Sequence, residues 1–365
     1  MVECVLHIGV EKTGSTSIQT SLSKSRPRLL ACGVLYPEAL GEKNQVKAYA
    51  YASETGVDEL KSQWGLDNPT SIAQFRSRLR EQLAQEITLK KPKTICVSNE
   101  HCSSRLLLNS EIERLRALLE AHCSSIKIVI YLRRQGDALR SAYSTYVKTG
   151  GTAVFGPPGP EEINNKYNYD VILDRWASVF GEHNMDVRIL DRETLVDGDV
   201  VTDFFTKLGV GANEVNLEKD LNRSLGWVGS EFLRKFNAFV PYSIDNEFNP
   251  ARGNVQEIIE GLPDVPFEGD ASIMDAFDNA MIASNERVRL RYFPDLKGPL
   301  FPTVVGRSGD LQNQPVTAED LMRVMAHLWE FKQKQVIRLR NRLAKEVDSK
   351  TPSSKMAPVM RRAPG

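Results

Sequence analysis

Short apolar runs that alternate with longer amphipathic segments constrain the fold of this chain more than any other feature. The clearest run is IKIVIYL at residues 126–132, which is rich in β-branched residues and too short for a buried helix. Comparable runs predict buried strands at residues 2–8, 93–98 and 185–190. Helical patterns lie between and after these runs, at residues 15–31 (interrupted near Pro27), 70–89, 110–122, 170–180 and 199–208. Strands that alternate with helices predict crossover connections, and therefore an α/β fold with a parallel sheet.

The pattern changes after about residue 225, where helical pieces are separated by loops rich in proline and glycine. We expect a core at residues 1–215, a mostly helical part at residues 216–348 packed on it, and a disordered tail at residues 349–365. The helical part ends in a long basic amphipathic helix near residues 317–346. This helix is either an ordinary solvated face or a membrane-surface helix.

Composition argues against several classes of protein. Lysine plus arginine and aspartate plus glutamate both number 47, so no bulk charge favours nucleic acid, and an anion site must be built locally. The five cysteines show neither C-x-x-C nor Cys/His spacing, which argues against a disulfide framework or a zinc site. The sequence has no signal-peptide pattern and no apolar run approaching ~20 residues, so we expect a cytoplasmic protein.

The segment HIGVEKTGSTS, residues 7–17, lies between the first predicted strand and the first predicted helix. The nucleotide-binding pattern G-x-x-x-x-G-K-[ST] would place a lysine directly after Gly14, but here Lys12 lies inside the loop. Backbone N–H groups and the helix dipole at such a place attract an anion. The candidate phosphate ligands are Lys12, Thr13, Gly14, Ser15, Thr16 and Ser17. The alternative is an ordinary turn with a good helix N-cap.

The ends of the other predicted strands argue against a nucleoside triphosphatase, which needs a magnesium-binding acid at a strand end. The strand at 126–132 ends instead in Arg133 and Arg134, and the strand at 93–98 is followed by Asn99, Glu100 and His101. The sequence therefore predicts a phosphate site without a metal.

A second basic element, YLRRQGDALRSAYSTYVKTG at residues 131–150, has the pattern of a strand, a turn and a helix. Arg133 leaves the strand and Ser141 lies about two turns into the helix, so both could contact one anion beyond the sheet edge. Alternatively, Arg133 pairs with Asp137 and Ser141 only faces the helix surface.

Together these two segments resemble the sulfotransferase superfamily, whose members bind 3′-phosphoadenosine 5′-phosphosulfate (PAPS). Residues 11–17 are similar to the family's P-K-[TS]-G-[TS]-[TS] loop for the 5′-phosphosulfate, with Glu11 in place of proline. Residues 133–141 resemble its R-x-P-x-D-x-x-x-S pattern for the 3′-phosphate, with Gln135 in place of proline. Further similarity to bacterial carbohydrate-type sulfotransferase-like proteins covers much of residues 3–210.

The resemblance implies an α/β, P-loop-like three-layer core with a central parallel sheet and a mostly helical C-terminal part. It implies an enzyme that moves a sulfuryl group from PAPS to a hydroxyl of a saccharide or glycolipid, with adenosine 3′,5′-bisphosphate as product and no metal required. Lys12 would stabilise charge on the leaving oxygen. Arg307, in VVGRSGD, is similar to a basic loop residue that closes over the 3′-phosphate in several relatives.

The base that takes the acceptor's proton is predicted at SNEH, residues 98–101. Glutamate often has this role in saccharide sulfotransferases and histidine in those acting on phenols and steroids, and we favour Glu100 over His101. If neither is catalytic, Glu100 complements the dipole of the next helix and His101 caps it or lies at the core edge. The segment 43–51 is expected to be irregular and to form either an acceptor loop or a plain surface loop; its polar and aromatic residues are Lys43, Asn44, Lys47, Tyr49 and Tyr51. The competing functions are a small-molecule or nucleotide kinase and a non-catalytic nucleotide-binding protein.

Overall fold

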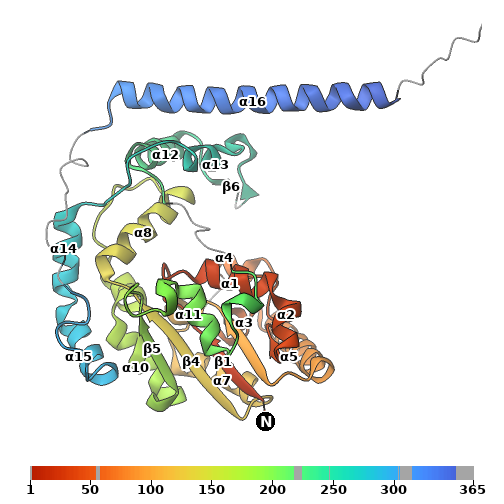
Figure 1. Cartoon of the computed structure of the whole chain (residues 1–365), viewed down its shortest axis with the longest axis vertical. Coiled ribbons are helices and arrows are strands. Elements are labelled where there is room, and N and C mark those ends of the chain that lie inside the picture. Colours follow the sequence, from red (N-terminus) through yellow and green to blue (C-terminus); the bar gives the residue numbers. More distant parts are fainter. Residues whose placement is uncertain are drawn as a thin grey trace, which may run out of the picture. The chain divides into compact units, whose positions relative to one another are not determined.

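In the computed structural model, which describes residues 2–54, 58–217, 224–245, 247–302, 304 and 315–350, a parallel sheet has the strand order β2-β3-β1-β4-β5. The strands are β1 (Glu3–His7), β2 (Val34–Leu35), β3 (Thr94–Ser98), β4 (Ser125–Leu132) and β5 (Met185–Ile189). In Figure 1, β1, β4 and β5 are labelled side by side. The four predicted strands are confirmed, and β2 was not predicted.

Helices cover both faces of this sheet, so the core has three layers. One face packs on α3 (Val46–Ala52), α5 (Pro69–Lys90), α7 (Asn109–Glu120) and α10 (Tyr169–Phe180). The other packs on α1 (Ser15–Lys24), α2 (Arg26–Ala31) and α11 (Val200–Lys207). Alternate strand residues serve the two faces, since Leu6 belongs to the first cluster and Val5 to the second. Because both faces are buried, the strands read as continuous apolar runs. The predicted α/β fold with a central parallel sheet is confirmed.

The interruption predicted near Pro27 is confirmed: α1 and α2 meet at Ser25, because Pro27 fits the first turn of a new helix better than a helix interior. Two other local predictions need correction. The helix expected to begin at residue 110 begins at Asn109, and Glu111 Oε2 accepts the backbone N–H groups of Leu107 (2.8 Å) and Leu108 (3.1 Å) at its start. The segment 43–51, expected to be irregular, contains most of the buried helix α3.

The chain divides into two compact units. The first holds the sheet and consists of Met1–Thr149, Ala153–Ser224 and Phe267–Gln314, so it includes α14 (Ala271–Ala280) and α15 (Ile282–Tyr292). The second consists of Gly150–Thr152, Leu225–Pro266 and Pro315–Gly365. It contains α12 (Trp227–Phe239), a short hairpin of β6 (Ser243–Ile244) and β7 (Glu247–Phe248), α13 (Val255–Glu260) and α16 (Ala318–Lys350). Compactness alone does not show which segments fold independently, so the predicted domain boundary after residue 215 stays a prediction.

Of the predicted disordered tail, residues 349 and 350 belong to α16 and residues 351–365 lie outside the described residues. Over the described ranges, each helix is too short or too polar to cross a lipid bilayer.

Candidate active site

The strands β1, β3 and β4 end at one edge of the sheet, where the candidate residues meet. His7, the last residue of β1, is in register with Ser98 of β3 and Val129 of β4. The chain leaves β1 for a helix on one face of the sheet, whereas β3 leads to α7 and β4 to α10 on the other face. Such a reversal opens a crevice beyond the carboxyl ends of the strands. A pocket of about 560 Å³ lies here.

Most of the predicted site residues line this one pocket: Lys12, Gly14, Ser15, Thr16, Ser17, Glu100, His101, Arg133 and Ser141. Glu11, Thr145 of α8 (Gln135–Lys148) and Val200 of α11 line it as well. Thr13 does not, because its hydroxyl donates to the carbonyl of Val10 (2.6 Å) and its side chain is buried. Arg307 lies outside the described residues.

Three residues of the loop have a left-handed backbone: Gly9 (φ 82°), Lys12 (φ 69°) and Gly14 (φ 87°). Glycine is required at two of them by close packing as well as by φ. A Cβ on Gly9 would lie 2.7 Å from Cβ of Glu100, and one on Gly14 would lie 2.7 Å from Cγ1 of Val200. Lys12 adopts this conformation despite its side chain, at a cost of roughly 1–3 kcal/mol that is typical of functional sites.

The N-terminus of α1 has the properties of an anion site. Gly14 is its N-cap and supplies no side-chain hydrogen bond, and no acidic residue occupies the first turn. Ser15 is only 5% exposed, and its Oγ has no hydrogen-bond partner among the described residues. A buried hydroxyl without a partner is costly, and an anion at the helix N-terminus would satisfy it. The residues present therefore fit a phosphate or sulfate group.

Two cations line the same pocket. The Lys12 ammonium donates to Thr145 Oγ1 (2.5 Å). Burial lowers its pKa, and the charge of Glu11 opposes this shift only in part. Arg133 Nη1 donates to the carbonyl of Lys12 (2.9 Å), which ties the end of β4 to the loop, and burial also lowers the pKa of Arg133. A bound anion would favour the charged form of both groups.

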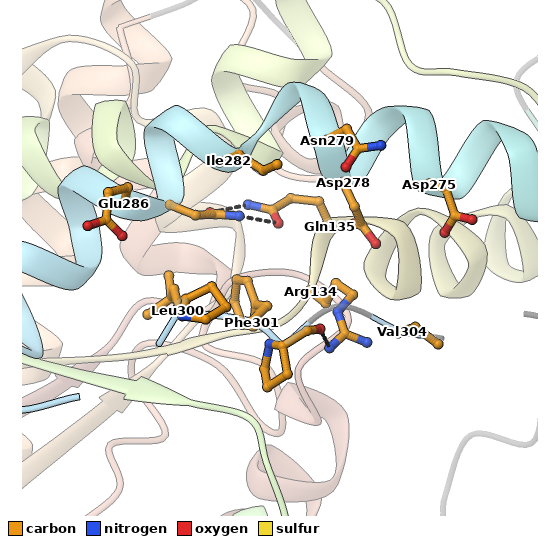
Figure 2. Close-up of a pocket in the computed structure, with 13 residues that line it drawn as sticks. Arg134, Gln135, Asp275, Asp278, Asn279, Ile282, Glu286, Leu300, Phe301 and Val304 are labelled. Carbon is orange, nitrogen blue, oxygen red and sulfur yellow. Dashed lines mark hydrogen bonds between the residues drawn. The ribbon is translucent and has the colours of Figure 1, made fainter. Parts of the chain in front are cut away.

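The neighbouring Arg134 and Gln135 lie elsewhere, against a second cavity of about 280 Å³ (Figure 2). Arg134 donates to the carbonyl of Pro302 and pairs with Asp137 (3.7 Å). Gln135 and Asn285 exchange hydrogen bonds of 2.8 and 3.1 Å. The glutamine that replaces the pattern's proline thus fixes the start of α8 to α15, and it leaves Arg133 and Ser141 in the first pocket.

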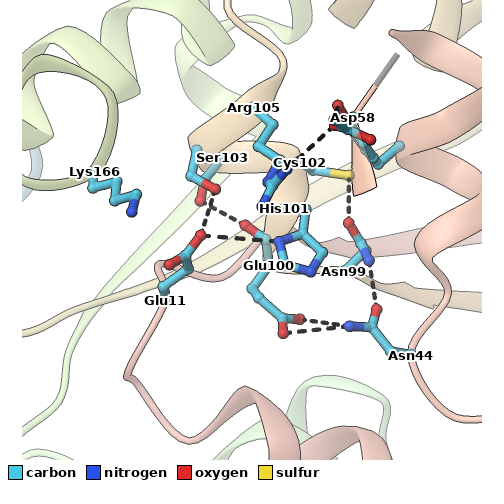
Figure 3. A network of polar contacts seen from close by, with 12 residues as sticks. Glu11, Asn44, Asp58, Asn99, Glu100, His101, Cys102, Ser103, Arg105 and Lys166 are labelled. Atoms are coloured by element: carbon cyan, nitrogen blue, oxygen red, sulfur yellow. Dashed lines mark hydrogen bonds and ion pairs between the residues drawn. The ribbon is translucent and has the colours of Figure 1, made fainter. Parts of the chain in front are cut away.

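Glu100 occupies the N-cap position of α6 (His101–Arg105), but its side chain makes no capping hydrogen bond. Gln19 Nε2 donates to its Oε2 (2.6 Å), and Asn44 Nδ2 lies 3.3 and 3.4 Å from its two carboxylate oxygens. Asn99 Nδ2 in turn donates to Asn44 Oδ1, which orients the Asn44 amide toward Glu100 (Figure 3). Gln19 and Asn44 therefore hold Glu100 as a hydrogen-bond acceptor at the edge of the pocket.

His101 has a different partner. Its Nδ1 lies 3.9 Å from Glu11 Oε1, which also accepts a hydrogen bond from Ser104 Oγ (2.8 Å) (Figure 3). Burial raises the pKa of Glu11, but His101, Lys166 and Ser104 together outweigh it and lower that pKa to about 2. Glu11, where the related pattern has proline, is thus an ionised carboxylate near His101, but His101 Nδ1 has no hydrogen-bond partner among the described residues. The structure brings both candidate bases to the pocket, and of the two only Glu100 is fixed there by side-chain hydrogen bonds.

Within the described part of the chain, no group of three or more histidine, cysteine, aspartate or glutamate side chains is arranged to hold a metal ion.

Comparison with known proteins adds little to what the residues of the site indicate. No family model matches the chain. It is 34% identical over 140 residues to an uncharacterised protein of Archaeoglobus fulgidus, and the match covers 37% of each chain. Among solved structures, it is similar to a sulfotransferase from Alicyclobacillus acidocaldarius, with 16% identity and a TM-score of 0.40 over 80% of this chain and 97% of that one. The function proposed below rests on the residues of the site.

Replacing Gly9 by alanine is expected to lower the free energy of unfolding by about 3 kcal/mol, because the methyl group adds a clash with Glu100 to the cost of a left-handed alanine. Gly209→Ala is the matched control, since Gly209 has φ 68° and no atom within 4 Å of the added Cβ. Its loss should be about 1 kcal/mol. Urea denaturation measures the loss of unfolding free energy in both variants. Equal losses would show that the contact with Glu100 does not require glycine at position 9.

Proposed function

We propose that this protein is a PAPS-dependent sulfotransferase that transfers a sulfuryl group to a hydroxyl of a saccharide or glycolipid. The observation that supports this most directly is that one pocket contains the helix N-terminus with its unpartnered Ser15 hydroxyl and also Arg133 and Ser141. A ligand with anionic groups at both ends of a nucleoside would engage both. The loop would hold the 5′-phosphosulfate, and Arg133 with Ser141 would hold the 3′-phosphate.

The proposed reaction breaks the bond between sulfur and the oxygen that bridges to the 5′-phosphate, and it forms a bond from sulfur to the acceptor oxygen. Negative charge develops on the leaving oxygen, and the Lys12 ammonium is the group placed to stabilise it. An ammonium has three donors, so its hydrogen bond to Thr145 leaves others for this oxygen. Most of the catalytic effect would come from positioning and charge stabilisation.

The acceptor hydroxyl must lose its proton, and we propose that Glu100 receives it. Gln19 and Asn44 act as positioning residues, because both donate to this carboxylate and fix its direction. His101 is the alternative base, with Glu11 Oε1 3.9 Å from its Nδ1. The five cysteines are free thiols, which suits the reducing cytoplasm that we propose as the enzyme's location.

Adenosine 3′,5′-bisphosphate is expected to raise the melting temperature by roughly 3–6 °C at a hundredfold excess over its Kd, without magnesium. Arg133→Ala should abolish most of this shift, because a buried charge-assisted contact to the 3′-phosphate is lost. Arg134→Ala is the matched control and should keep the shift, since Arg134 lines the other cavity. Equal stabilisation by ATP with magnesium would instead support a kinase.

Transfer itself is tested with isotopically labelled PAPS and a panel of saccharides, glycolipids and phenols, with the products identified by mass spectrometry. Sulfation of saccharides or glycolipids supports the proposed acceptor class, and sulfation of phenols alone would contradict it. Binding of PAPS without transfer to any acceptor would identify a non-catalytic nucleotide-binding protein.

A further inference from the structure

The helix α16 belongs to the second unit and is covered along only part of its length. Its first half packs on α12 and α13, with Val324 fully buried and Leu328 and Phe331 half-buried. His327 Nε2 lies 3.0 Å from the carbonyl oxygen of Ile258. Beyond residue 335, every side chain through residue 346 is exposed. Figure 1 draws α16 as one long uninterrupted helix.

A second apolar stripe runs along α16, on a face other than the one that packs on α12 and α13. It consists of residues that are 39% to 67% exposed: Met322, Met325, Trp329, Val336, Leu339 and Leu343. Their spacing of three, four, seven, three and four residues is that of positions a and d of a heptad repeat, with Lys332 at the remaining d position. A repeat of 3.5 residues is typical of a helix that pairs with another helix in a left-handed coiled coil.

In the C-terminal half of α16 the stripe is narrow, which distinguishes a helical partner from a lipid surface; in the N-terminal half the flanking g positions hold Leu321 and Leu328. In the C-terminal half, the flanking e and g positions hold Gln333, Gln335, Arg340 and Arg342. A helix that lies on a membrane presents a broader apolar face, whereas a strict a/d stripe is a coiled-coil seam. The observations therefore favour a helix as the occupant.

The charged residues of α16 indicate the identity of the partner helix. Residues 318–333 carry a net charge of −1, from Glu319, Asp320 and Glu330 against Arg323 and Lys332. Residues 334–346 carry a net charge of +4, from Lys334, Arg338, Arg340, Arg342 and Lys345 against Glu346. A parallel pair would place the two strongly cationic halves together. An antiparallel pair about a twofold axis near residue 334 separates them and sets each against the weakly acidic half of the other helix. In that register Met325 lies opposite Leu343, and Trp329 lies opposite Leu339.

We propose that α16 pairs with α16 of a second copy of this chain as an antiparallel coiled coil, making the protein a homodimer. Such an interface is isologous. In this register the apolar layers are Met325 with Leu343 and Trp329 with Leu339, each made twice, whereas Val336 lies opposite Lys332 near the axis and Met322 lies opposite Glu346. The proposal is independent of the sulfotransferase function.

Sedimentation equilibrium of the full chain tests this interface. The wild type should be a dimer, and Leu339→Glu should raise the dimer dissociation constant by about 100-fold or more, because a carboxylate in the seam must lose its water. Ile337→Glu is the matched control: Ile337 is 53% exposed against 59% for Leu339, but it lies off the stripe. It should leave the dimer intact. Circular dichroism checks that both variants are folded.

Disulfide cross-linking, in a Cys32→Ser background that removes the exposed native thiol, tests the orientation. A double variant Met325→Cys/Leu343→Cys should cross-link between chains, and either single variant should not, since identical positions are about 27 Å apart in the antiparallel pair. Cross-linking of the single variants would show a parallel pair and overturn the proposal.

Flotation with vesicles of phosphatidylserine and phosphatidylcholine tests the alternative that the stripe binds a lipid surface. A monomer that floats with the vesicles and loses this binding in Leu339→Glu would show that the stripe binds lipid. A wild-type monomer that binds no vesicles would equally overturn the proposed dimer.

Discussion

Replacing Glu100 with glutamine is expected to lower turnover by roughly 100- to 10,000-fold while affinity for adenosine 3′,5′-bisphosphate is kept. The amide has nearly the same shape but cannot accept the acceptor's proton. The surroundings of Glu100 sharpen this expectation. Gln19 and Asn44 both donate to the carboxylate, so the substituted amide has one oxygen to accept their hydrogen bonds and none to spare for the acceptor hydroxyl. Transfer from labelled PAPS and calorimetric binding of the bisphosphate measure the two effects separately.

His101→Ala is the comparison for this experiment, because His101 is adjacent in sequence and lines the same pocket. Its turnover should fall by about 10-fold at most, since the carboxylate beside its ring is Glu11 rather than Glu100. If His101→Ala abolishes transfer and Glu100→Gln stays active, the roles are reversed and the saccharide acceptor loses its support. If both variants turn over normally, the base lies elsewhere in the chain.

The sheet was predictable because its strands are buried on both faces. A strand such as β4, with Ile128, Ile130 and Leu132 facing one helical layer and Val129 and Tyr131 the other, gives a continuous apolar run in the sequence. The strand β2 was missed because it has only two residues, which show no period. The helices α14 and α15 could be recognised as helical, but periodicity does not reveal the surface on which a helix packs.

That the loop residues, Arg133 and Ser141 would meet in one pocket was predictable for a different reason. The loop and Arg133 follow strand ends directly, and parallel strands bring their carboxyl ends to one edge. The amides that hold Glu100 were not predictable, since Gln19 is 81 residues and Asn44 56 residues from it in sequence. Likewise Gln135 pairs with Asn285, 150 residues away. The role of a side-chain amide is decided by the group that folding places opposite it, and no local pattern records this.

Substitution of Lys12 tests the role of its positive charge in the reaction. Lys12→Ala is expected to reduce turnover by ~100-fold or more and to cost less in affinity for the bisphosphate product, because the ammonium acts mainly on charge that develops during transfer. Alanine is as strained as lysine at φ 69°, so the backbone contribution to stability should change little.

The control is Lys148→Ala, since the Lys148 charge also influences Lys12 but its side chain does not line the pocket. Turnover of that variant should stay within about threefold of the wild type, because a charge at a distance is screened by solvent and salt. Single-turnover rates and product Kd values for both variants separate chemistry from binding. Equal losses of rate and affinity in Lys12→Ala would make Lys12 a binding residue. The leaving oxygen would then need another hydrogen-bond donor. The Ser15 hydroxyl is the candidate in the loop, because it is buried and has no partner among the described residues.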